Sequence, residues 1–549
     1  MKQVIINGAD LTVEQIAAVA GGAKVALTSD SVVLDRVSAS RQVITDAILN
    51  GEQIYGVTTL FGAMADQYVG PDRLADVQKL ALWQHRSATG PRLPEKDVRA
   101  AMLLRANSLI KGASGIRLEI IERFATFLNA GMHPHVYQRG SIGASGDLVP
   151  LTYIAACVVG LDDAFQVDVG DETIGCLEAL RRLGLDPIQL DPKEGLALNN
   201  GTGACTGVAA NAAKRALDLA AFTLGIHALV AQALLATDQS FDPFIHAVKP
   251  HPGQIWTAAQ MAELVAGSKT IRSEAAGDRG HRIGKLIQDR YSLRCLPQFI
   301  GPIIDGLANA ARQVEVEANS ANDNPLIDVE RKELLHTGNF LAQYTGVAMD
   351  QLRYFIGLMA KHVDVQTALL MTPEFSNGLS ASLVGNEEAG INVGLKSLQV
   401  LGNSTMPLIS FYGQSIVDRF PTHAEQFNQN INSQAMGSAN LARESLDVLE
   451  HFLAVALLCS VQAVELRAKQ VSGSYDARTI LSPATVPLYE VARRLALGEP
   501  DAARPLHWND LDEFIQPKVE ALLGDLSAGG ELLEAIGGVR RAIFEFASQ

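Results

Sequence analysis

The sequence predicts a mainly α-helical protein built around a long helical bundle. Three segments after residue 200 support this prediction, because each is long, rich in Ala, Leu and Val, and free of Pro: residues 220–236, 340–365 and 445–469. Segments that are apolar on nearly every face are typical of helices at the centre of a bundle or an oligomer. Few alternating, strand-like runs lie between them. We therefore expect helix packing to form the core.

The first 200 residues differ in character from the rest of the chain. Gly and Pro recur often in them, the predicted helical stretches are shorter, and the loops carry the unusual sequences. No internal repeat or low-complexity linker separates this region from the later residues. We expect residues 1–200 to form an N-terminal region with catalytic loops, and residues 201–549 to form the long central bundle and C-terminal helices.

The composition indicates a large soluble protein that acts on a small molecule. The chain has 549 residues, is 48% hydrophobic and carries a net charge of −15 at pH 7. A surface for nucleic acid or an anionic membrane needs clustered Lys and Arg, so neither is the expected partner. The apolar run at 220–236 is interrupted by His227 and Gln232 and is too short to span a bilayer.

The cysteines and the first residues favour the cytoplasm as the compartment. The five Cys are scattered and show no CxxC spacing, unlike a disulfide framework. The opening sequence MKQVIINGAD turns polar before it could form the apolar stretch of a secretory signal. We therefore expect a cytoplasmic protein.

Several familiar motifs are excluded by their context. HPH at 133–135 has the spacing of metal ligands, but no HExxH or neighbouring cluster accompanies it, so we expect loop histidines and no metal. GTGACTG at 201–207 lacks the spacing of a dinucleotide-binding loop and is predicted to begin a helix. Ser145 lies outside a GxSxG nucleophile elbow, which argues against serine hydrolysis.

The sequence RGSIGASGDLVPL at 139–151 holds a tripeptide that can become an electrophile. Gly143 and Gly146 let the backbone bend tightly around Ser145. If the Gly146 nitrogen attacks the Ala144 carbonyl, cyclisation and loss of two waters yield 4-methylidene-imidazol-5-one, a ring with an exocyclic methylene. No standard side chain is a strong electrophile, so this ring would add chemistry that ordinary residues lack.

The same tripeptide occurs a second time, at residues 113–115. That copy runs directly into IRLEIIERFATFL, an amphipathic sequence predicted to form a helix, and Ser114 is predicted to be its N-terminal cap. The tripeptide alone therefore does not identify a catalytic group, and its context must decide.

The surrounding segments resemble the aromatic amino acid lyase family, which builds this ring. The family includes histidine, phenylalanine and tyrosine ammonia-lyases and related 2,3-aminomutases. The resemblance implies a mainly α-helical homotetramer with a long central bundle and active sites shared between three subunits. It rests on segments that occur in the family's order: IYGVTTLFG (54–62), GSIGASGDLVPL (140–151), LALNNGTGACTG (196–207), QDRYSLRCLPQ (288–298), NDNPLI (322–327), HTGNF (336–340) and HAEQFNQNINSQ (423–434).

The resemblance assigns the principal catalytic roles. Ala144, Ser145 and Gly146 would form the electrophilic ring that makes the substrate amine a better leaving group. Tyr55 would be the general base, which requires a phenol pKa well below its usual value. Arg294 would clamp the substrate carboxylate, and a planar guanidinium suits that bidentate grip.

Further positions match the family's pocket. Tyr291 and Asn200 match residues that hold the substrate and stabilise the ring. The chain departs from the common pattern at Thr58 and Leu60, and we expect Leu60 to add bulk beside the base. The remaining matches, for which packing or helix capping is the alternative role, are Gln298, Phe340, Glu425 and Gln429.

The substrate is predicted from two neighbouring residues. In LWQHRSATG at 82–90, Gln84 and His85 fall where the family places its ring-recognition pair. Leaving two polar groups unpaired against a bare phenyl ring is costly, which disfavours phenylalanine. The resemblance of the second half to bacterial tyrosine lyases favours tyrosine or 3,4-dihydroxyphenylalanine. The alternatives are histidine as substrate and a purely structural role for His85.

Two other functions remain open from the sequence. A 2,3-aminomutase would share every residue named above and differ only in returning ammonia to the β carbon. A catalytically dead helical scaffold would be expected to have lost Tyr55, Ser145 or Arg294, and all three are present. The sequence favours an ammonia-lyase that releases an arylacrylic acid.

Overall fold

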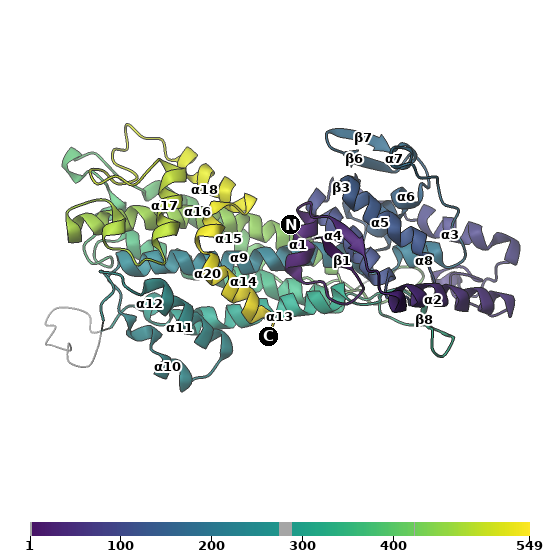
Figure 1. The fold of residues 1–549 in the computed structure, drawn as a ribbon. Coiled ribbons are helices and arrows are strands. Elements are labelled where there is room, and N and C mark those ends of the chain that lie inside the picture. Colours follow the sequence, from purple (N-terminus) through teal and green to yellow (C-terminus); the bar gives the residue numbers. More distant parts are fainter. Residues whose placement is uncertain (1–2, 274–287, 422) are drawn as a thin grey trace. The chain divides into compact units, whose positions relative to one another are not determined.

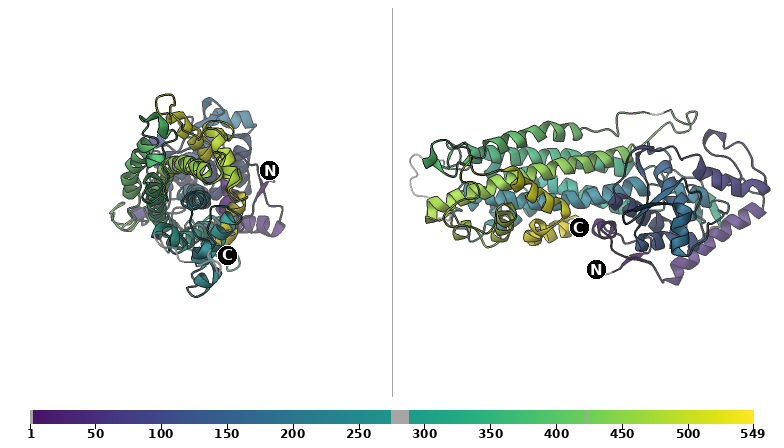
Figure 2. Two further views of the ribbon diagram at one scale, coloured as in Figure 1. Left: turned by 90° about the vertical axis from the view of Figure 1, so that its left-hand side faces the viewer. Right: turned by 90° about the horizontal axis from the view of Figure 1, so that it is seen from above.

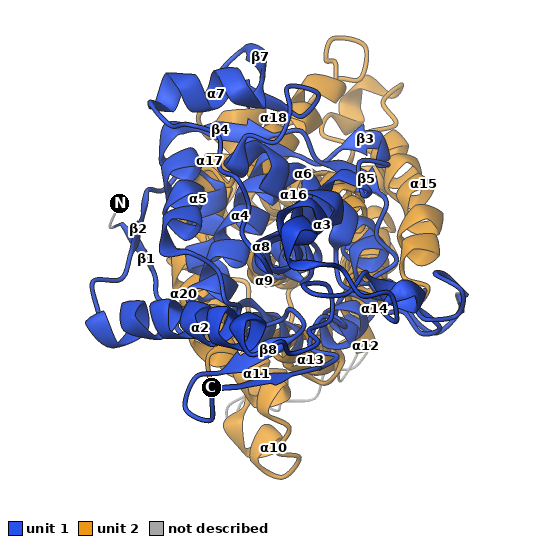
Figure 3. Cartoon of the chain, turned by 90° about the vertical axis from the view of Figure 1, so that its right-hand side faces the viewer, with its two compact units in different colours: residues 1–214, 310–351, 415–443 blue, residues 215–309, 352–414, 444–549 orange. Residues whose placement is uncertain are grey.

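The computed structural model describes residues 3–273, 288–421 and 423–549. Helices dominate these residues, and the strands are short. The chain forms two compact units, which Figure 3 shows in blue and orange. Unit 1 comprises residues 1–214, 310–351 and 415–443, and unit 2 comprises residues 215–309, 352–414 and 444–549.

The expected division at residue 200 differs from these units in one respect. Residues 1–200 lie within unit 1, but the range 201–549 contributes to both units. The reason is that the chain returns to unit 1 at residues 310–351 and 415–443. Among the described residues, four long helices have residues in both units: α9 (Gly203–Ala233), α13 (Leu296–Ala318), α14 (Gln343–Met371) and α16 (Ala435–Ser472).

The prediction of long helices is confirmed by α9, α14 and α16, which contain most of the three apolar segments. Figure 2, left, looks along the helices of unit 2, where green and yellow-green helices surround the blue-teal α9. The most apolar windows of α9 and α16 are long enough to cross a membrane, but they are 100% and 83% buried inside the protein. Burial therefore accounts for their composition, as in a core helix.

Unit 1 holds shorter helices and small sheets (Figure 1). Its helices are α1 (Val13–Ala20), α2 (Ser31–Leu49), α3 (Leu74–Trp83), α4 (Glu95–Leu109), α5 (Leu118–Ala130), α6 (Leu148–Val159), α7 (Cys176–Leu183) and α8 (Glu194–Asn199). Its strands are β1 (Val4–Ile6), β2 (Val25–Leu27), β3 (Thr89–Arg92), β4 (Met132–Pro134), β5 (Tyr137–Arg139), β6 (Gln166–Val169), β7 (Glu172–Gly175), β8 (Leu326–Asp328) and β9 (Glu333–Leu335).

The strands pair locally and do not form a continuous sheet. β1 pairs with β2 in parallel, whereas β3–β5, β4–β6–β7 and β8–β9 are antiparallel. The core of unit 1 is helical, and α4 lies at its centre, since every residue from Asp97 to Leu109 is buried. Acidic residues in its first turn, Glu95 and Asp97, complement the positive end of the helix dipole.

Unit 2 contains the remaining helices of the described chain. They are α10 (Pro243–Ala247), α11 (Pro252–Val265), α12 (Tyr291–Arg294), α15 (Lys396–Tyr412), α17 (Val486–Ala496), α18 (Gln516–Ala528), α19 (Glu531–Ala535) and α20 (Gly537–Ala547). α11, α17 and α18 carry Pro at the first turn, where its missing N–H costs no hydrogen bond.

Three local predictions can be compared with the structure. α9 begins at Gly203, which confirms that residues 201–207 lead into a helix. The prediction of loop histidines at 133–135 is wrong for His133, which lies in β4 opposite Asp168, and is confirmed for His135, which lies in the loop after that strand. The prediction that Ser114 caps the following helix is also wrong, because α5 begins only at Leu118 and Ser114 donates instead to the Asp323 carboxylate.

Candidate active site

The tripeptide at 144–146 forms a tight bend just before α6. Gly143 and Gly146 have φ angles of 67° and 69°, in the left-handed region that favours glycine. The bend lies against the segment that comes after α8: the Asp147 N–H donates to the Gly201 carbonyl at 2.7 Å. A Cβ added to Gly146 would lie 2.2 Å from the Gly201 oxygen, so only glycine permits this close approach.

Side chains from two distant segments hold Ser145. The Asn200 amide nitrogen donates to the Ser145 carbonyl at 2.9 Å, and the Gln429 amide nitrogen donates to Ser145 Oγ at 3.1 Å. The Asn200 oxygen is buried and has no hydrogen-bond partner, so it remains available as an acceptor. The Gln429 contact joins residues 284 positions apart in the chain, and the Asn200 contact joins residues 55 positions apart.

A cavity of about 380 Å³ opens over this bend. This volume suits an aromatic amino acid. The residues that line it and that the sequence analysis names are Tyr55, Gln84, His85, Ala144, Ser145, Asn200, Phe340, Glu425 and Gln429. A smaller cavity of about 210 Å³ shares His85 and Ser145 with it and also reaches Gly146.

Tyr55 lies in the cavity with its hydroxyl held by the backbone. The Gly62 N–H donates to the Tyr55 hydroxyl oxygen at 2.8 Å. The rings of Phe61 and His336 meet the Tyr55 ring edge-on at 6.5 and 6.4 Å between centroids. An N–H that donates to a phenol oxygen stabilises the phenolate, which is the form that a general base requires.

The expectation of a lowered Tyr55 pKa is wrong for unit 1 taken by itself. Burial raises the pKa of Tyr55, the Gly62 hydrogen bond lowers it, and the nearby Glu425 carboxylate raises it further. Burial has the largest effect because it disfavours the charged phenolate. A cation would be needed beside this phenol to bring its pKa down.

The predicted recognition pair lines the cavity at the end of α3. Gln84 is the C-cap residue of that helix, and His85 directly follows it. His85 Nδ1 donates to the Ala81 carbonyl at 2.8 Å, which assigns the proton to that nitrogen and leaves Nε2 as an acceptor. Burial lowers the pKa of His85. The ring is therefore neutral near pH 7 and able to accept a hydrogen bond.

Asn199 supports this pair and is a site residue that the sequence analysis missed. Its amide nitrogen donates to the same Ala81 carbonyl at 2.7 Å, and its oxygen is buried without a partner. The doubled asparagine of LALNNGTG is the feature of the sequence that points to Asn199 as well as to Asn200. The other cavity residues that the sequence analysis did not single out are Phe61, Ala81, Leu148, Leu196, Asn324, Gly338, Leu341, Asn428 and Ile431.

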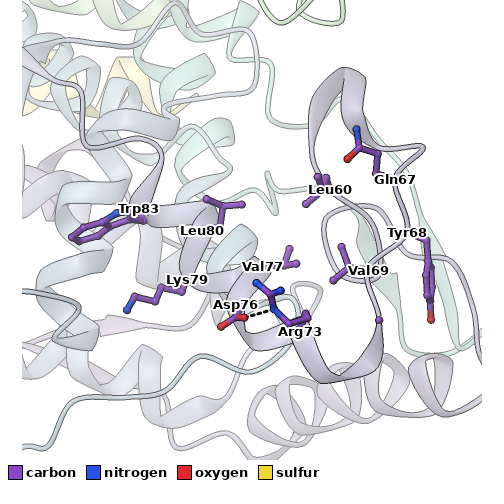
Figure 4. A pocket seen from close by; sticks show the side chains of 11 residues that line it. Leu60, Gln67, Tyr68, Val69, Arg73, Asp76, Val77, Lys79, Leu80 and Trp83 are labelled. Carbon is purple, nitrogen blue, oxygen red and sulfur yellow. Dashed lines mark hydrogen bonds and ion pairs between the residues drawn. The ribbon is translucent and has the colours of Figure 1, made fainter.

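Leu60 lines a different cleft from the one that contains Tyr55. Figure 4 shows Leu60 beside Leu80 and Val77 of α3, with Gln67, Tyr68 and Val69 along the loop. The cleft has a volume of about 660 Å³, and its Arg73–Asp76 ion pair spans 2.5 Å. Phe61, and not Leu60, lines the cavity with Tyr55 and packs against its ring, so the expectation that Leu60 adds bulk beside the base is wrong for this unit.

The predicted carboxylate clamp belongs to unit 2. Tyr291 and Arg294 form the ends of the short helix α12, and the Arg294 guanidinium lies 4.7 Å from the centre of the Tyr291 ring. Arg294 Nε donates to the Asp289 carbonyl at 3.3 Å. The Gln298 amide oxygen is buried without a partner. None of these three predicted site residues is among the residues that line the cavity in unit 1.

No group of three or more His, Cys, Asp and Glu side chains suited to a metal ion occurs within residues 3–273, 288–421 and 423–549. The two histidines of HPH instead pair with carboxylates: His133 lies 2.9 Å from Glu95, and His135 lies 2.6 Å from Asp168. These pairs tie β4 to α4 and β6.

Comparison with known proteins agrees with the geometry of the cavity. The model of the aromatic amino acid lyase family matches residues 11–494. The chain is 64% identical to an aromatic ammonia-lyase of Loktanella atrilutea over 99% of both chains. It is 53% identical to a phenylalanine ammonia-lyase of Nostoc punctiforme, over 97% of this chain and 94% of that one.

Solved structures show the same fold. The tyrosine aminomutase of Streptomyces globisporus superposes with a TM-score of 0.87 at 30% identity, over 98% of both chains. The family match covers most of the chain, and the bend at 144–146, the cavity and the helical bundle are all in place. The protein therefore belongs to the aromatic amino acid lyase family and is a carbon–nitrogen lyase of the ammonia-lyase type.

Proposed function

We propose that the protein eliminates ammonia from an aromatic L-amino acid with a hydroxylated ring, tyrosine or 3,4-dihydroxyphenylalanine, and releases the arylacrylic acid. One observation carries the proposal: Gln84 and His85 line the same cavity as Tyr55 and Ser145. The polar pair and the reacting groups can therefore contact the two ends of one small substrate.

The residues around the bend fit 4-methylidene-imidazol-5-one as the internal cofactor. Small residues at 143, 144 and 146 allow the close approach, and Asn200 and Gln429 hold the carbonyl and the hydroxyl of Ser145. Once formed, the ring supplies an electrophile for the substrate amine. The buried oxygens of Asn199 and Asn200 could accept hydrogen bonds from an ammonium group at this end of the cavity.

Tyr55 is proposed to remove the β proton, and Arg294 to bind the substrate carboxylate. The raised pKa of Tyr55 in isolation means that the base needs a neighbouring cation. Family members build each site from loops of three subunits, so a homotetramer could place a guanidinium there. Val400, Leu408 and Phe411 on one face of α15 are 65%, 50% and 68% exposed, which supports assembly into an oligomer.

The substrate preference rests on the protonation of the recognition pair. A neutral His85 with a free Nε2 lone pair can accept a hydrogen bond from a phenol, and the Gln84 amide can donate or accept one. Binding a bare phenyl ring would leave these groups unpaired, at a cost that can reach several kcal/mol. The cytoplasm remains the proposed compartment, supported by five cysteines that are all free thiols.

Two alternatives have specific support. A relative that is 53% identical is a phenylalanine ammonia-lyase, which favours phenylalanine as substrate. A structural neighbour is a tyrosine aminomutase, which favours return of ammonia to the β carbon of the same hydroxylated ring. Histidine, the further alternative from the sequence, would place an imidazole against His85.

One assay decides between these substrates. The purified protein is offered tyrosine, 3,4-dihydroxyphenylalanine, phenylalanine and histidine separately, and kcat/KM and products are measured for each. We expect the highest kcat/KM on a hydroxylated ring and an arylacrylate as product. A β-amino acid product would identify an aminomutase, and a preference for phenylalanine or histidine would overturn the substrate assignment.

The double variant Gln84→Phe with His85→Leu tests whether the pair causes the preference. We expect the ratio of kcat/KM for tyrosine over phenylalanine to fall by about tenfold or more, because the hydrogen bonds to the hydroxyl are lost. Formation of the ring, measured as an intact mass that is lower than the encoded mass by two waters, should be unaffected. An unchanged ratio would show that the pair does not read the aromatic ring.

A further inference from the structure

A buried arginine lies directly behind the segment that contacts the tripeptide. Arg105, near the end of α4, is 1% exposed. Its Nη2 donates to the Ala197 carbonyl at 2.6 Å, and its Nη1 donates to the Asn200 carbonyl at 3.2 Å. Both carbonyls lie at the C-terminal end of α8. Carbonyls at that end of a helix lack N–H partners within the helix, and a nearby cation is favourable. One guanidinium therefore holds the turn that leads from α8 to Gly201.

The contact between this guanidinium and the turn is close. A Cβ added to Gly201 would lie 1.9 Å from Arg105 Nη1, so the guanidinium lies directly against the glycine and leaves no room for a side chain there. On its other side, the Gly201 carbonyl accepts from the Asp147 N–H and faces Gly146. Residues 200 and 201 therefore lie between Arg105 and the tripeptide, and each contacts both.

Other buried groups orient the arginine. Arg105 Nη1 also donates to Asn322 Oδ1 at 3.0 Å, and Ser108 Oγ donates to the same oxygen at 3.1 Å. Asn322 in turn donates to Thr202 Oγ1 at 2.7 Å. Burial lowers the pKa of Arg105 to about 10, so it remains charged at neutral pH. Asp323, which is ion-paired with Lys193 at 2.6 Å, lies near enough to favour that charge.

We propose that Arg105 is a positioning residue for formation of the electrophilic ring: acting through Asn200 and Gly201, it presses the bend at 144–146 into the geometry for cyclisation. In that step the Gly146 nitrogen bonds to the Ala144 carbonyl carbon. The carbonyl oxygen leaves as water with the N–H protons of Gly146 and Ser145, which creates the ring C=N bond. Ser145 Oγ leaves as the second water with the Ser145 Cα proton, which creates the methylidene. The inference rests on the proposed internal cofactor.

The same helix supplies a matched control. Arg99 is also on α4 and is 2% exposed, and it too donates to carbonyls near helix ends: Nε to Val19 at 2.8 Å and Nη1 to Leu128 at 3.1 Å. Val19 and Leu128 are not among the residues that line the cavity. Arg99 therefore reproduces the burial and the bonding of Arg105 without its contact to the turn at 200–201.

The test is the rate at which the new chain loses two waters. Wild type, Arg105→Lys and Arg99→Lys are synthesised in a cell-free system, and intact mass is followed over time alongside the thermal unfolding midpoint. Lysine keeps the charge but cannot bind both carbonyls and Asn322. We expect Arg105→Lys to lose water about tenfold more slowly or not at all, and Arg99→Lys to match wild type even if both unfold at similarly lower temperatures.

The outcomes separate this inference from the proposed function. A wild-type chain without the mass deficit would overturn the proposed ring and this inference with it. A normal rate in Arg105→Lys would overturn only this inference, and so would an equal slowing in Arg99→Lys, which would indicate general destabilisation. If Arg105→Lys does not fold, the variant Asn322→Ala takes its place. We expect this variant to lose the two waters severalfold more slowly, because the guanidinium loses one of the groups that orient it. An unchanged rate would overturn the inference.

Discussion

The two Ala-Ser-Gly tripeptides of this chain have the same sequence but different hydrogen-bond partners and neighbours. Ser114 is fully buried, and its hydroxyl donates to the Asp323 carboxylate at 3.0 Å, whereas Ser145 faces a cavity and its hydroxyl accepts from Gln429. Both tripeptides end in a glycine with positive φ, 67° at Gly115 and 69° at Gly146. The backbone bend is therefore common to both, and the difference lies in what surrounds it.

The surroundings differ in kind. A Cβ on Gly115 would meet the side chains of Ile327 and Ile44 at 2.7 Å, whereas one on Gly146 would meet backbone atoms of Gly201. The first copy is packed among apolar side chains next to a buried ion pair. The second is held between backbone segments and faces open space. The contrast supports the proposal that the second copy is the reaction centre, because only that copy is both held by close backbone contacts and open to a cavity.

Replacing each serine by alanine should give the largest difference between the two copies in water loss and in turnover. Ser145→Ala should abolish both the loss of two waters and the turnover, because it removes the oxygen that leaves as the second water. Ser114→Ala should keep both. Intact mass and initial rates measure these effects. Full activity in Ser145→Ala, or loss of the mass deficit in Ser114→Ala, would reverse the assignment of the two copies.

Tyr55→Phe should leave the ring intact and impair only the proton transfer that comes after ring formation. The variant removes the hydroxyl that accepts from Gly62, and we expect kcat to fall by roughly 10²–10⁴ while the mass deficit remains. In wild type, the base acts as the phenolate, so we expect kcat/KM to increase as pH rises towards the pKa of Tyr55 in the assembled site, which a neighbouring cation sets below the raised pKa of the isolated unit. A flat pH profile and near-normal turnover in Tyr55→Phe would assign the proton to another group.

Replacing Gly146 and Gly115 by alanine should affect the rate of water loss at the second copy only. Gly146→Ala places a methyl group 2.2 Å from the Gly201 oxygen, so the backbone must separate, and we expect water loss to slow by about tenfold or more. Gly115→Ala meets flexible isoleucine side chains, so it should lower stability and leave the mass deficit unchanged. Time-resolved intact mass measures both, and equal slowing in the two variants would contradict the distinction.

The smallest expected effect is on stability at the first copy. Ser114→Ala leaves a buried Asp323 oxygen without its hydroxyl donor, although Lys193 still pairs with the other oxygen. We expect the free energy of unfolding to fall by about 1–3 kcal/mol, as for other lost bonds to buried charges. Denaturant titration measures this change. A variant as stable as wild type would show that the hydroxyl contributes only packing.

Much of the fold and part of the site could be predicted from the sequence, for identifiable reasons. Apolar runs on every helix face predict burial, which α9 and α16 confirm, whereas α14 exposes Tyr354 and Val365 on one side. The role of Ser114 could not be predicted, because its partner Asp323 lies more than two hundred residues further along the chain. Asn199 was missed because only its contact with Ala81 beside His85 distinguishes it from any buried asparagine.

Sequence alone was enough to establish the helical class, the residues that make a cyclising bend possible, and the family to which the motifs belong. These properties depend on local periodicity, on glycine at strained positions and on residue identity. Tertiary structure was needed to establish which of the two tripeptides faces a cavity, that burial raises the pKa of Tyr55, and that Arg105 lies behind Gly201. The physical reason is that solvent exposure, electrostatic surroundings and close backbone approach depend on segments that are distant in the chain and meet only when it folds.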